Sequence, residues 1–548
     1  MSHPSFTGRR AHAALLVACA AFLLAGAFHG YVWYDESFSV ALVKKGFADI
    51  WRIDAADVHP PLYYLVLHLL YLVFGTNVTV YRLFSVAGAI ATGALGLTHV
   101  RRDFGARAGM LFTFFACVMP NLVYYATQIR MYSWVTFTVT LCFLEACRIR
   151  ELSRSGAAAP GREWATFALA SLASAYLHYY GAMAAFLVNV LLLVALACDA
   201  RRRQRGAAGA GSSGKRSVAV LLALAAGQLA AFAPWAVALL GQMGSISTGG
   251  YWINLDWPVS YLQILGVPLL ADRLIWGLID GQSWVHGAPP TLWYVAGVIT
   301  VTFAGTVVAN ARAKNAAERW AGGIGMAVYL GVIALAWLAG TLVHTPILFY
   351  RYMAVAAGPM LVALSLAFGR EGAARPAALA TARWACVAVV LAFSVRCQAD
   401  ALPAAYAPDN AVPGAAFARI VGENGGTEAT PVIASDYTMM GVLDVEHPEI
   451  AQTYPNWLMH YWNGAYEAYA PAVSMVQDIA ATPAGTSGKV VFMAEKPEDE
   501  AVQRAEDFSN MLSGQIGGQR LRVEGVESYR RPYDKRIYTF VTLTREEL

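Results

Sequence analysis

The stretch Tyr31-Val-Trp-Tyr-Asp35-Glu36-Ser37-Phe38 follows directly after the first apolar run of the chain, residues 11–28. An uncharged run of this length predicts a membrane helix, so two adjacent carboxylates stand where that helix leaves the bilayer. Charged side chains at this depth are costly, which makes the acidic pair a functional-site hypothesis. The alternative is that Asp35 and Glu36 only mark the end of the lipid-facing segment.

The composition of the chain indicates a polytopic membrane protein. Of its 548 residues, 57% are hydrophobic and 14% are charged, whereas soluble domains carry about 25% charged residues. The apolar residues fall in blocks of about 17–25 residues, the length of a spanning helix. The net charge is +4, and the basic residues mark membrane topology rather than nucleic-acid binding. The seven cysteines are scattered and show no metal-binding spacing and no disulfide framework.

The distribution of Lys and Arg predicts the topology, because short basic loops lie on the cytoplasmic side. The apolar run 62–74 is too short to span and is expected to lie in the interface. The Trp-rich segment 241–290 is expected to rest on the bilayer surface as a movable flap. Eleven spans are predicted, at about 11–30, 79–100 and 108–124, then one that returns by Arg148, one at 164–177, one that returns to Arg201, and further spans at 217–240, 291–310, 320–342, 353–369 and 384–396.

A change in composition near residue 398 predicts a second domain. Charged residues become frequent, and β-type runs at 431–434, 489–493 and 536–541 alternate with helical patterns at 415–421, 472–479 and 498–511. This alternation is typical of an α/β layered domain. The sequence therefore predicts a transmembrane domain over 1–397 and an extracytoplasmic α/β domain over 398–548.

By this topology, polar clusters from separate loops meet on the extracytoplasmic face. A carboxylate there could act as a general base toward a hydroxyl or an amine, and an arginine fork suits a phosphate leaving group. The clusters are Asp35 with Glu36; His59; Gln128, Arg130 and Tyr132; His178, Tyr179 and Tyr180; and Tyr350, Arg351 and Tyr352.

Each of these residues also has a purely structural interpretation. Arg351 could be a snorkelling arginine at a helix end. Arg130 could be a loop cation paired with Glu36. His59 could be a turn residue, and His178 and the tyrosines could be interface anchors.

A metal site is a further alternative. His59, His178 and Asp35 could ligate a metal, but no close spacing supports it, so no cofactor is predicted.

Together, these segments resemble the GT-C glycosyltransferases of the protein O-mannosyltransferase and aminoarabinose (lipid A) transferase type. The resemblance covers roughly residues 11–370, and its motifs follow one another in the family order. The motifs are Tyr34-Asp35-Glu36-Ser37, His59-Pro60-Pro61-Leu62-Tyr63-Tyr64, Gly75 with Arg82-Leu83-Phe84-Ser85, Gln128-Ile-Arg130-Met-Tyr132 and Phe349-Tyr350-Arg351-Tyr352.

The resemblance implies a GT-C fold and the transfer of one sugar from a polyprenyl-phosphate donor with inversion. It implies that Asp35 is the base, that Glu36 occupies the second acidic position and that Arg351 holds the donor phosphate. Arg130 is a second candidate for the phosphate, and the substrate would be lined by His59, Tyr132, His178, Tyr179, Tyr350 and Tyr352. This subgroup generally needs no metal.

The expected function is therefore that of an inner-membrane glycosyltransferase. Its partners would be the polyprenyl-phosphate sugar, membrane lipids and an extracytoplasmic acceptor, which could be a glycolipid, a polysaccharide or a protein. One alternative is a polymerase or ligase that moves whole glycans from a lipid pyrophosphate. The other is a lipid or sugar transporter, although the internal repeats typical of transporters are not seen.

Overall fold

The computed structural model describes residues 6–206, 212–249, 253, 264–265, 290–370, 377–453, 473–474, 487–516 and 519–547. The chain divides into two compact units. The helical unit comprises residues 1–28, 58–63 and 82–398, and the sheet unit comprises residues 29–57, 64–81 and 399–548. The segment that carries Asp35 and Glu36 thus belongs to the same unit as the C-terminal region.

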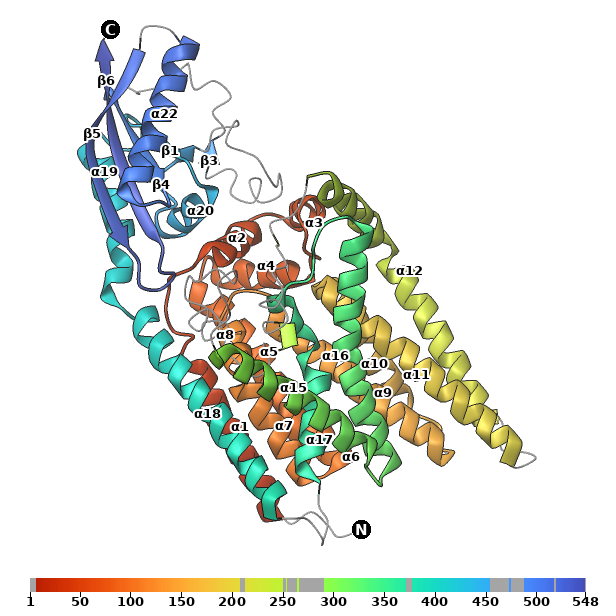
Figure 1. Ribbon diagram of the computed structural model, residues 1–548. Helices are drawn as coiled ribbons and strands as arrows, with labels where there is room; N and C mark the ends of the chain where they lie inside the picture. The colour runs from red at the N-terminus through yellow and green to blue at the C-terminus, as the bar shows by residue number, and fades with distance from the viewer. Residues whose placement is uncertain are drawn as a thin grey trace. The chain divides into compact units, whose positions relative to one another are not determined.

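The helical unit is built mainly from long apolar helices, and the α-helices of the unit are labelled in Figure 1. They are α1 (Phe6–Leu24), α5 (Val78–Leu95), the π-helix η1 (Gly96–Val100), α6 (Arg101–Phe104), α7 (Ala106–Val118), α8 (Pro120–Ala126), α9 (Tyr132–Ser155), α10 (Gly161–Leu177), α11 (Tyr179–Gly206), α12 (Ser212–Gly249), α15 (Pro290–Ala311), α16 (Ala316–Leu342), the 3-10 helix η3 (Tyr350–Ala356), α17 (Ala357–Gly369) and α18 (Ala377–Ala405).

Every predicted span overlaps helical residues of the structure, and the span predicted at 108–124 falls on two helices, α7 and α8. Within the described ranges, six helices are long and apolar enough to cross a membrane, or seven if the bent pair α7–α8 is one span. The total of eleven spans therefore remains a prediction. The predicted interfacial run is α4 (Leu62–Phe74), a short apolar helix. The predicted flap begins inside α12, and most of it lies outside the described residues.

The helix α17 forms the centre of the helical unit. The apolar segment Tyr350–Gly369 contains α17, and 94% of its most apolar 18-residue stretch is buried. A helix that is apolar all round requires neighbours on every side. Gly358 permits the close approach of α9, because a Cβ at this position would lie 1.7 Å from Thr140 Oγ1. Small residues at such crossings are typical of membrane helices. The residues that precede α17 are therefore held by a rigid element.

The sheet unit combines short helices from the first loop with the C-terminal layers. Its elements are α2 (Tyr34–Val43), α3 (Phe47–Ala56), most of α4, the 3-10 helix η4 (Pro408–Ala411), α19 (Val412–Glu423), β1 (Val432–Ala434), α20 (Tyr437–Glu446), β2 (Gln452–Thr453), β3 (Val473–Ser474), β4 (Lys489–Ala494), α22 (Glu498–Ile516), β5 (Gln519–Arg530) and β6 (Ile537–Glu547).

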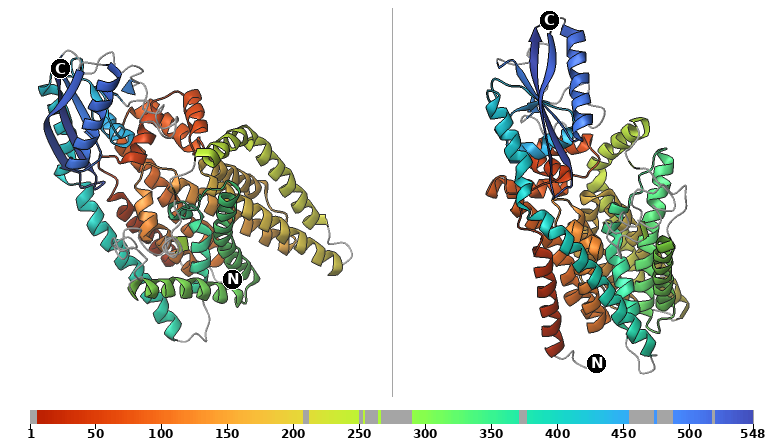
Figure 2. Two further views of the ribbon diagram at one scale, coloured as in Figure 1. Left: turned by 45° about the horizontal axis from the view of Figure 1, so that its top comes forward. Right: turned by 60° about the vertical axis from the view of Figure 1, so that its left-hand side comes forward.

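The six-stranded sheet has the order β3-β2-β1-β4-β6-β5. The strands β1 to β4 pair in parallel, whereas β6 runs antiparallel to β4 and β5. Successive side chains of a strand face opposite sides. Val541 of β6 therefore packs in the core with Phe508 of α22, whereas the neighbouring Phe540 stacks on Phe417 of α19 at 5.7 Å. The two helices cover opposite faces of the sheet (Figure 2).

The prediction of an α-helical membrane protein with a C-terminal α/β domain is confirmed as a fold class. Strands occur at 432–434, 489–494 and 537–547, and helices occur at 412–423 and 498–516. The helix predicted over 472–479 is wrong at Val473–Ser474, which form β3, and the rest of that range lies outside the described residues. The strand β5 was not predicted, because its charged residues hide the alternation and a bulge between Val523 and Gly525 interrupts it.

Candidate functional site

The helical unit contains a cavity of about 260 Å³ between α11, α12 and α16. Its walls are mainly aliphatic and aromatic, and a few polar groups from predicted site residues line it as well. An apolar cavity with a small number of placed polar groups is the usual form of a ligand site. The lining residues that matter here are Val58, His59, His178, Tyr179, Tyr180, Met183, Phe232, Leu239, Gln242, Val343, Ile347 and Tyr352.

His178 lies in the turn between α10 and α11, where its extended backbone ends the first helix. Its Nδ1 accepts a hydrogen bond of 3.1 Å from the backbone N–H of Tyr180. The ring is buried and lies 5.0 Å from the ring of Tyr352 and 5.9 Å from that of Tyr132. Gly181 is required here, because a Cβ would lie 2.4 Å from the carbonyl oxygen of Ser174. The close pairing of α10 and α11 thus places the imidazole at the cavity.

A buried cation stands beside this histidine. The Arg130 guanidinium donates a hydrogen bond of 2.8 Å to Nε2 of His59, and only 3% of Arg130 is exposed. Burial lowers the pKa of His178 well below its usual range, and its electrostatic interactions with His59 and Arg130 lower it further. The imidazole of His178 is therefore neutral at pH 7 and can both donate and accept hydrogen bonds.

This depressed pKa predicts a pH dependence of stability. Unfolded His178 would take up a proton below about pH 6.5, whereas the folded side chain would not, because its pKa is lowered. His178 therefore makes its full contribution to the free energy of unfolding above about pH 6.5, and this contribution is lost as the pH falls. We expect the melting temperature in detergent to decline less steeply between about pH 7 and about pH 5 in His178→Gln than in the wild type. Parallel curves for the two proteins would contradict the buried neutral imidazole.

The cavity wall also carries a polar chain that the sequence did not reveal. The Tyr179 hydroxyl donates to Oε1 of Gln242 and accepts a hydrogen bond of 3.0 Å from Nε1 of Trp235. Gln242 and Trp235 both belong to α12 and are buried. Neither residue was predicted, because Trp235 lies in the apolar run 217–240 and Gln242 lies in the segment 241–290, which was interpreted as a surface flap. The proline inside α12, Pro234, next to Trp235, is the signal that could have identified this part of the helix.

The predicted cluster of Tyr350, Arg351 and Tyr352 lies in η3. The ring of Tyr350 is 4.3 Å from that of Phe349, and the ring of Tyr352 is 5.2 Å from that of Tyr180. The Arg351 guanidinium lies 5.5 Å from the ring centre of Phe349, within the range of a cation–π contact. Tyr352 lines the cavity, while Arg351 is half-buried. The structure thus brings His59, Arg130, His178 and Tyr352 together in one unit.

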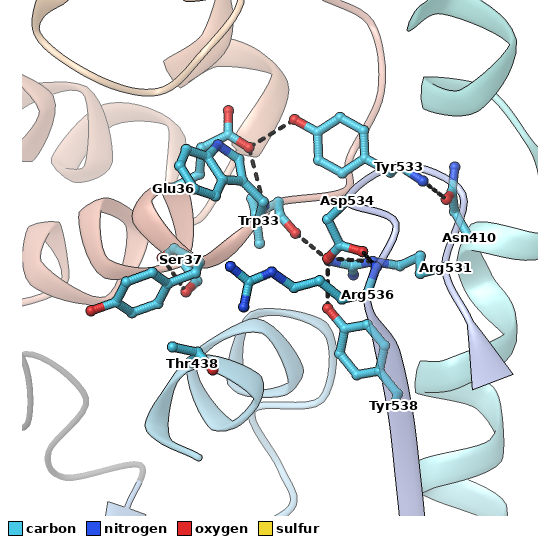
Figure 3. A network of polar contacts seen from close by, with 12 residues as sticks. Trp33, Glu36, Ser37, Asn410, Thr438, Arg531, Tyr533, Asp534, Arg536 and Tyr538 are labelled. Carbon is cyan, nitrogen blue, oxygen red and sulfur yellow. Dashed lines mark hydrogen bonds and ion pairs between the residues drawn. The ribbon is translucent and has the colours of Figure 1, made fainter. Parts of the chain in front are cut away.

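Asp35 and Glu36 lie in the sheet unit, at the first turn of α2, and their environments differ. Glu36 is fully buried, and its carboxylate accepts hydrogen bonds of 3.2 Å from the Trp33 backbone and 2.9 Å from the Tyr533 hydroxyl (Figure 3). Asp35 is half-buried. The more accessible of the two carboxylates is therefore Asp35.

A metal site receives no support from the geometry. Within the part of the chain that the structure describes, no group of three His, Cys, Asp or Glu side chains is arranged to hold a metal ion. The metal set considered from the sequence, His59, His178 and Asp35, is divided between the two units.

No protein-family model and no curated protein sequence matches this chain. Among solved structures, ArnT from Cupriavidus metallidurans in the apo state matches with a TM-score of 0.54 and 12% identity, over 96% of this chain and 97% of that chain. The same ArnT bound to undecaprenyl phosphate matches over the same shares with a TM-score of 0.55 and 12% identity. An oligosaccharyltransferase of Archaeoglobus fulgidus, in complex with Zn and sulfate, has a TM-score of 0.41 at 12% identity and covers 90% of this chain and 69% of that chain. The likeness to ArnT shows that this chain shares the fold of that protein, which agrees with the fold class that the resemblance implied.

Proposed function

We propose that the chain is a membrane glycosyltransferase that moves a single sugar from a polyprenyl-phosphate donor to an extracytoplasmic acceptor. The observation that carries this proposal is the apolar cavity with a buried arginine–histidine pair at its edge. The fold supports it, because ArnT shares that fold over almost its whole length and has been solved with undecaprenyl phosphate bound. The site would open away from the cytoplasm in an inner membrane.

In the proposed reaction, the walls of the cavity hold the isoprenoid part of the donor. Met183, Phe232 and Leu239 supply apolar surface for it. Arg130 and Arg351 bind the phosphate oxygens through planar N–H groups. Asp35 takes the proton of the acceptor hydroxyl or amine. The acceptor atom then bonds to the anomeric carbon from the face opposite the phosphate, the carbon–oxygen bond to the phosphate breaks, and polyprenyl phosphate leaves with its electron pair.

The proposal is tested with the purified full chain, a polyprenyl-phosphate sugar and envelope glycolipids or proteins as acceptors. The expected products are free polyprenyl phosphate and an acceptor whose mass increases by one sugar. An increase of several sugars from a pyrophosphate donor would favour the polymerase or ligase. Movement of labelled donor across proteoliposomes without a covalent product would favour the transporter. Either result would overturn the proposed function.

The proposed phosphate ligands predict a specific loss of lipid affinity. Replacing Arg351 or Arg130 with Gln should weaken the binding of polyprenyl phosphate by about 10- to 100-fold, because a hydrogen bond to a charged group contributes about 1.5–3 kcal/mol. Arg351→Lys should retain part of the affinity, because lysine keeps the positive charge. It should not retain all of it, because lysine lacks the planar pair of N–H donors of the guanidinium. Binding is measured by quenching of protein fluorescence with the lipid phosphate.

The matched control for these variants is Arg154→Gln. Arg154 is exposed and pairs with Glu151 at 2.8 Å, at the end of α9, far along the helix from Tyr132. Its replacement should leave the lipid affinity unchanged. Wild-type affinity in both the Arg130 and the Arg351 variants would show that the phosphate is held elsewhere.

A further inference from the structure

We infer that the tip of the β5–β6 hairpin, residues 531–536, positions the proposed base Asp35 by holding Glu36, which makes Glu36 and Tyr533 positioning residues. This inference rests on the proposed function for the role of Asp35. Every contact used to support it lies within the sheet unit.

The hairpin tip has a defined conformation. The backbone N–H of Arg531 donates to the carbonyl oxygen of Arg536 at 3.0 Å, and that of Lys535 donates to the carbonyl oxygen of Arg531 at 2.9 Å. Lys535 has a φ of 62°, in the left-handed region that side chains seldom adopt. The Tyr533 backbone N–H donates to Oδ1 of the buried Asn410 at 2.8 Å. Hydrogen bonds within the hairpin and to Asn410 of η4 therefore hold the tip in place.

Arg531 joins this tip to the chain just before α2. Its side chain is fully buried, and its guanidinium donates to the carbonyl oxygen of Val32 at 2.6 Å and to Glu446 at 2.7 Å. It also pairs with Asp534, and the ring of Tyr538 lies 4.9 Å away. Burial would lower the pKa of Arg531, but Tyr538, Asp534 and Glu446 outweigh it and raise the pKa, so the cation is retained.

Tyr533 supplies the contact to the acidic pair. Its hydroxyl donates to Oε2 of Glu36 at 2.9 Å, and the same oxygen accepts the backbone N–H of Trp33 at 3.2 Å. Its ring lies 4.7 Å from the ring of His29. Figure 3 shows the Tyr533 phenol directed at Glu36 while its backbone faces Asn410. Asp35 stands between Trp33 and Glu36, so the bonds that fix these two residues fix its backbone.

The other end of α2 is also anchored to the C-terminal region. Lys44, which ends the helix, pairs at 3.3 Å with Asp444 of α20, whose side chain is 2% exposed. The helix is thus held at its first turn by the hairpin tip and at its last turn by α20. Such placement matters to a general base, because an error of about 1 Å in geometry can cost about 10²-fold in rate. The carboxylate of Glu36 supports α2 through these hydrogen bonds, and the half-buried Asp35 is the more accessible of the two carboxylates.

The test uses Tyr533→Phe in the full chain, with Tyr529→Phe as the matched control. Both tyrosines belong to the β5–β6 hairpin and donate to a glutamate, but the partner of Tyr529 is Glu527. We expect Tyr533→Phe to raise hydrogen–deuterium exchange of the 33–43 amides about 10-fold, as the loss of a bond to a charged group would. We expect kcat to fall by about 10-fold, with an unchanged KM for the donor and an unchanged melting temperature. Tyr529→Phe should alter none of these.

A second arm separates positioning from general weakening of the structure. In an Asp35→Asn background, Tyr533→Phe should cause no further loss of kcat, because the group it positions is gone. A further loss equal to that in the wild type would overturn the inference, and so would wild-type exchange over 33–43 in Tyr533→Phe. The exchange measurement needs no turnover. If Tyr533→Phe raises the exchange of these amides in a chain that shows no transferase activity, the anchoring of α2 by the hairpin tip is supported, whereas the proposed function fails.

Discussion

Replacement of Asp35 with Asn should lower kcat by about 10²- to 10⁴-fold, the usual contribution of a general base. Asparagine keeps the shape of the side chain and can still accept a hydrogen bond, but it cannot take the proton of the acceptor. The backbone of Asp35 should stay in place, since Oγ of Ser39 donates to its carbonyl oxygen at 3.1 Å. The KM for the lipid donor should change little, because the phosphate and the isoprenoid are assigned to other residues.

The comparison requires folded protein and a carboxylate that is not part of the site. Asp49→Asn supplies the control, because Asp49 lies on α3 of the same unit and is exposed beside Arg52 at 3.8 Å. Both variants should keep the wild-type melting temperature, and Asp49→Asn should keep the wild-type rate. If Asp35→Asn transfers sugar at the wild-type rate, Asp35 is not the base.

Replacement of Arg531 with Met should destabilise the sheet unit by about 3–5 kcal/mol, the cost of removing one member of a buried ion pair. Glu446 and Asp534 would then lose their shared cation, and their side chains are only 15% and 3% exposed. The pKa of Glu446 is already raised by burial and is lowered in part by Arg531. Limited proteolysis of the C-terminal region over a range of temperatures reports the effect, since a two-unit membrane protein does not unfold in one step.

An exposed arginine of the same unit provides the control for this prediction. Arg419 pairs with Glu423 and Glu527 on the surface, and Arg419→Met should leave the protease resistance close to that of the wild type. Adding Glu446→Gln to Arg531→Met should recover part of the loss, because it removes a buried charge that has no remaining cation. Equal protease resistance of Arg531→Met and Arg419→Met would show that the buried network contributes no stability.

The helices of this protein could be predicted from the sequence because hydropathy is a local property. An apolar block such as 353–369 is sufficient to identify a buried helix, and α17 lies where that block does. The strand β5 could not be predicted in this way. It is an edge strand with many charged residues, and its order comes from pairing with β6 rather than from its own pattern.

The residues of the candidate site also fall into two groups, those that the sequence could predict and those that it could not. Histidines and tyrosines beside helix ends, such as His178 and Tyr352, could be identified because a polar residue stands out against an apolar run. Gln242 and Trp235 could not, since α12 is apolar around them and only its packing against Tyr179 gives them a role.

By itself, the sequence determined the apolar stretches, the acidic pair after the first of them, the motifs that resemble those of GT-C enzymes and the change to an α/β region near residue 398. Only the tertiary structure decided which carboxylate of the pair is fully buried and which distant side chain Glu36 contacts. Glu36 and Tyr533 are separated by 497 positions, and no local pattern connects them. The physical reason is that hydropathy and charge act along the chain, whereas a buried hydrogen bond depends on which distant segments pack together.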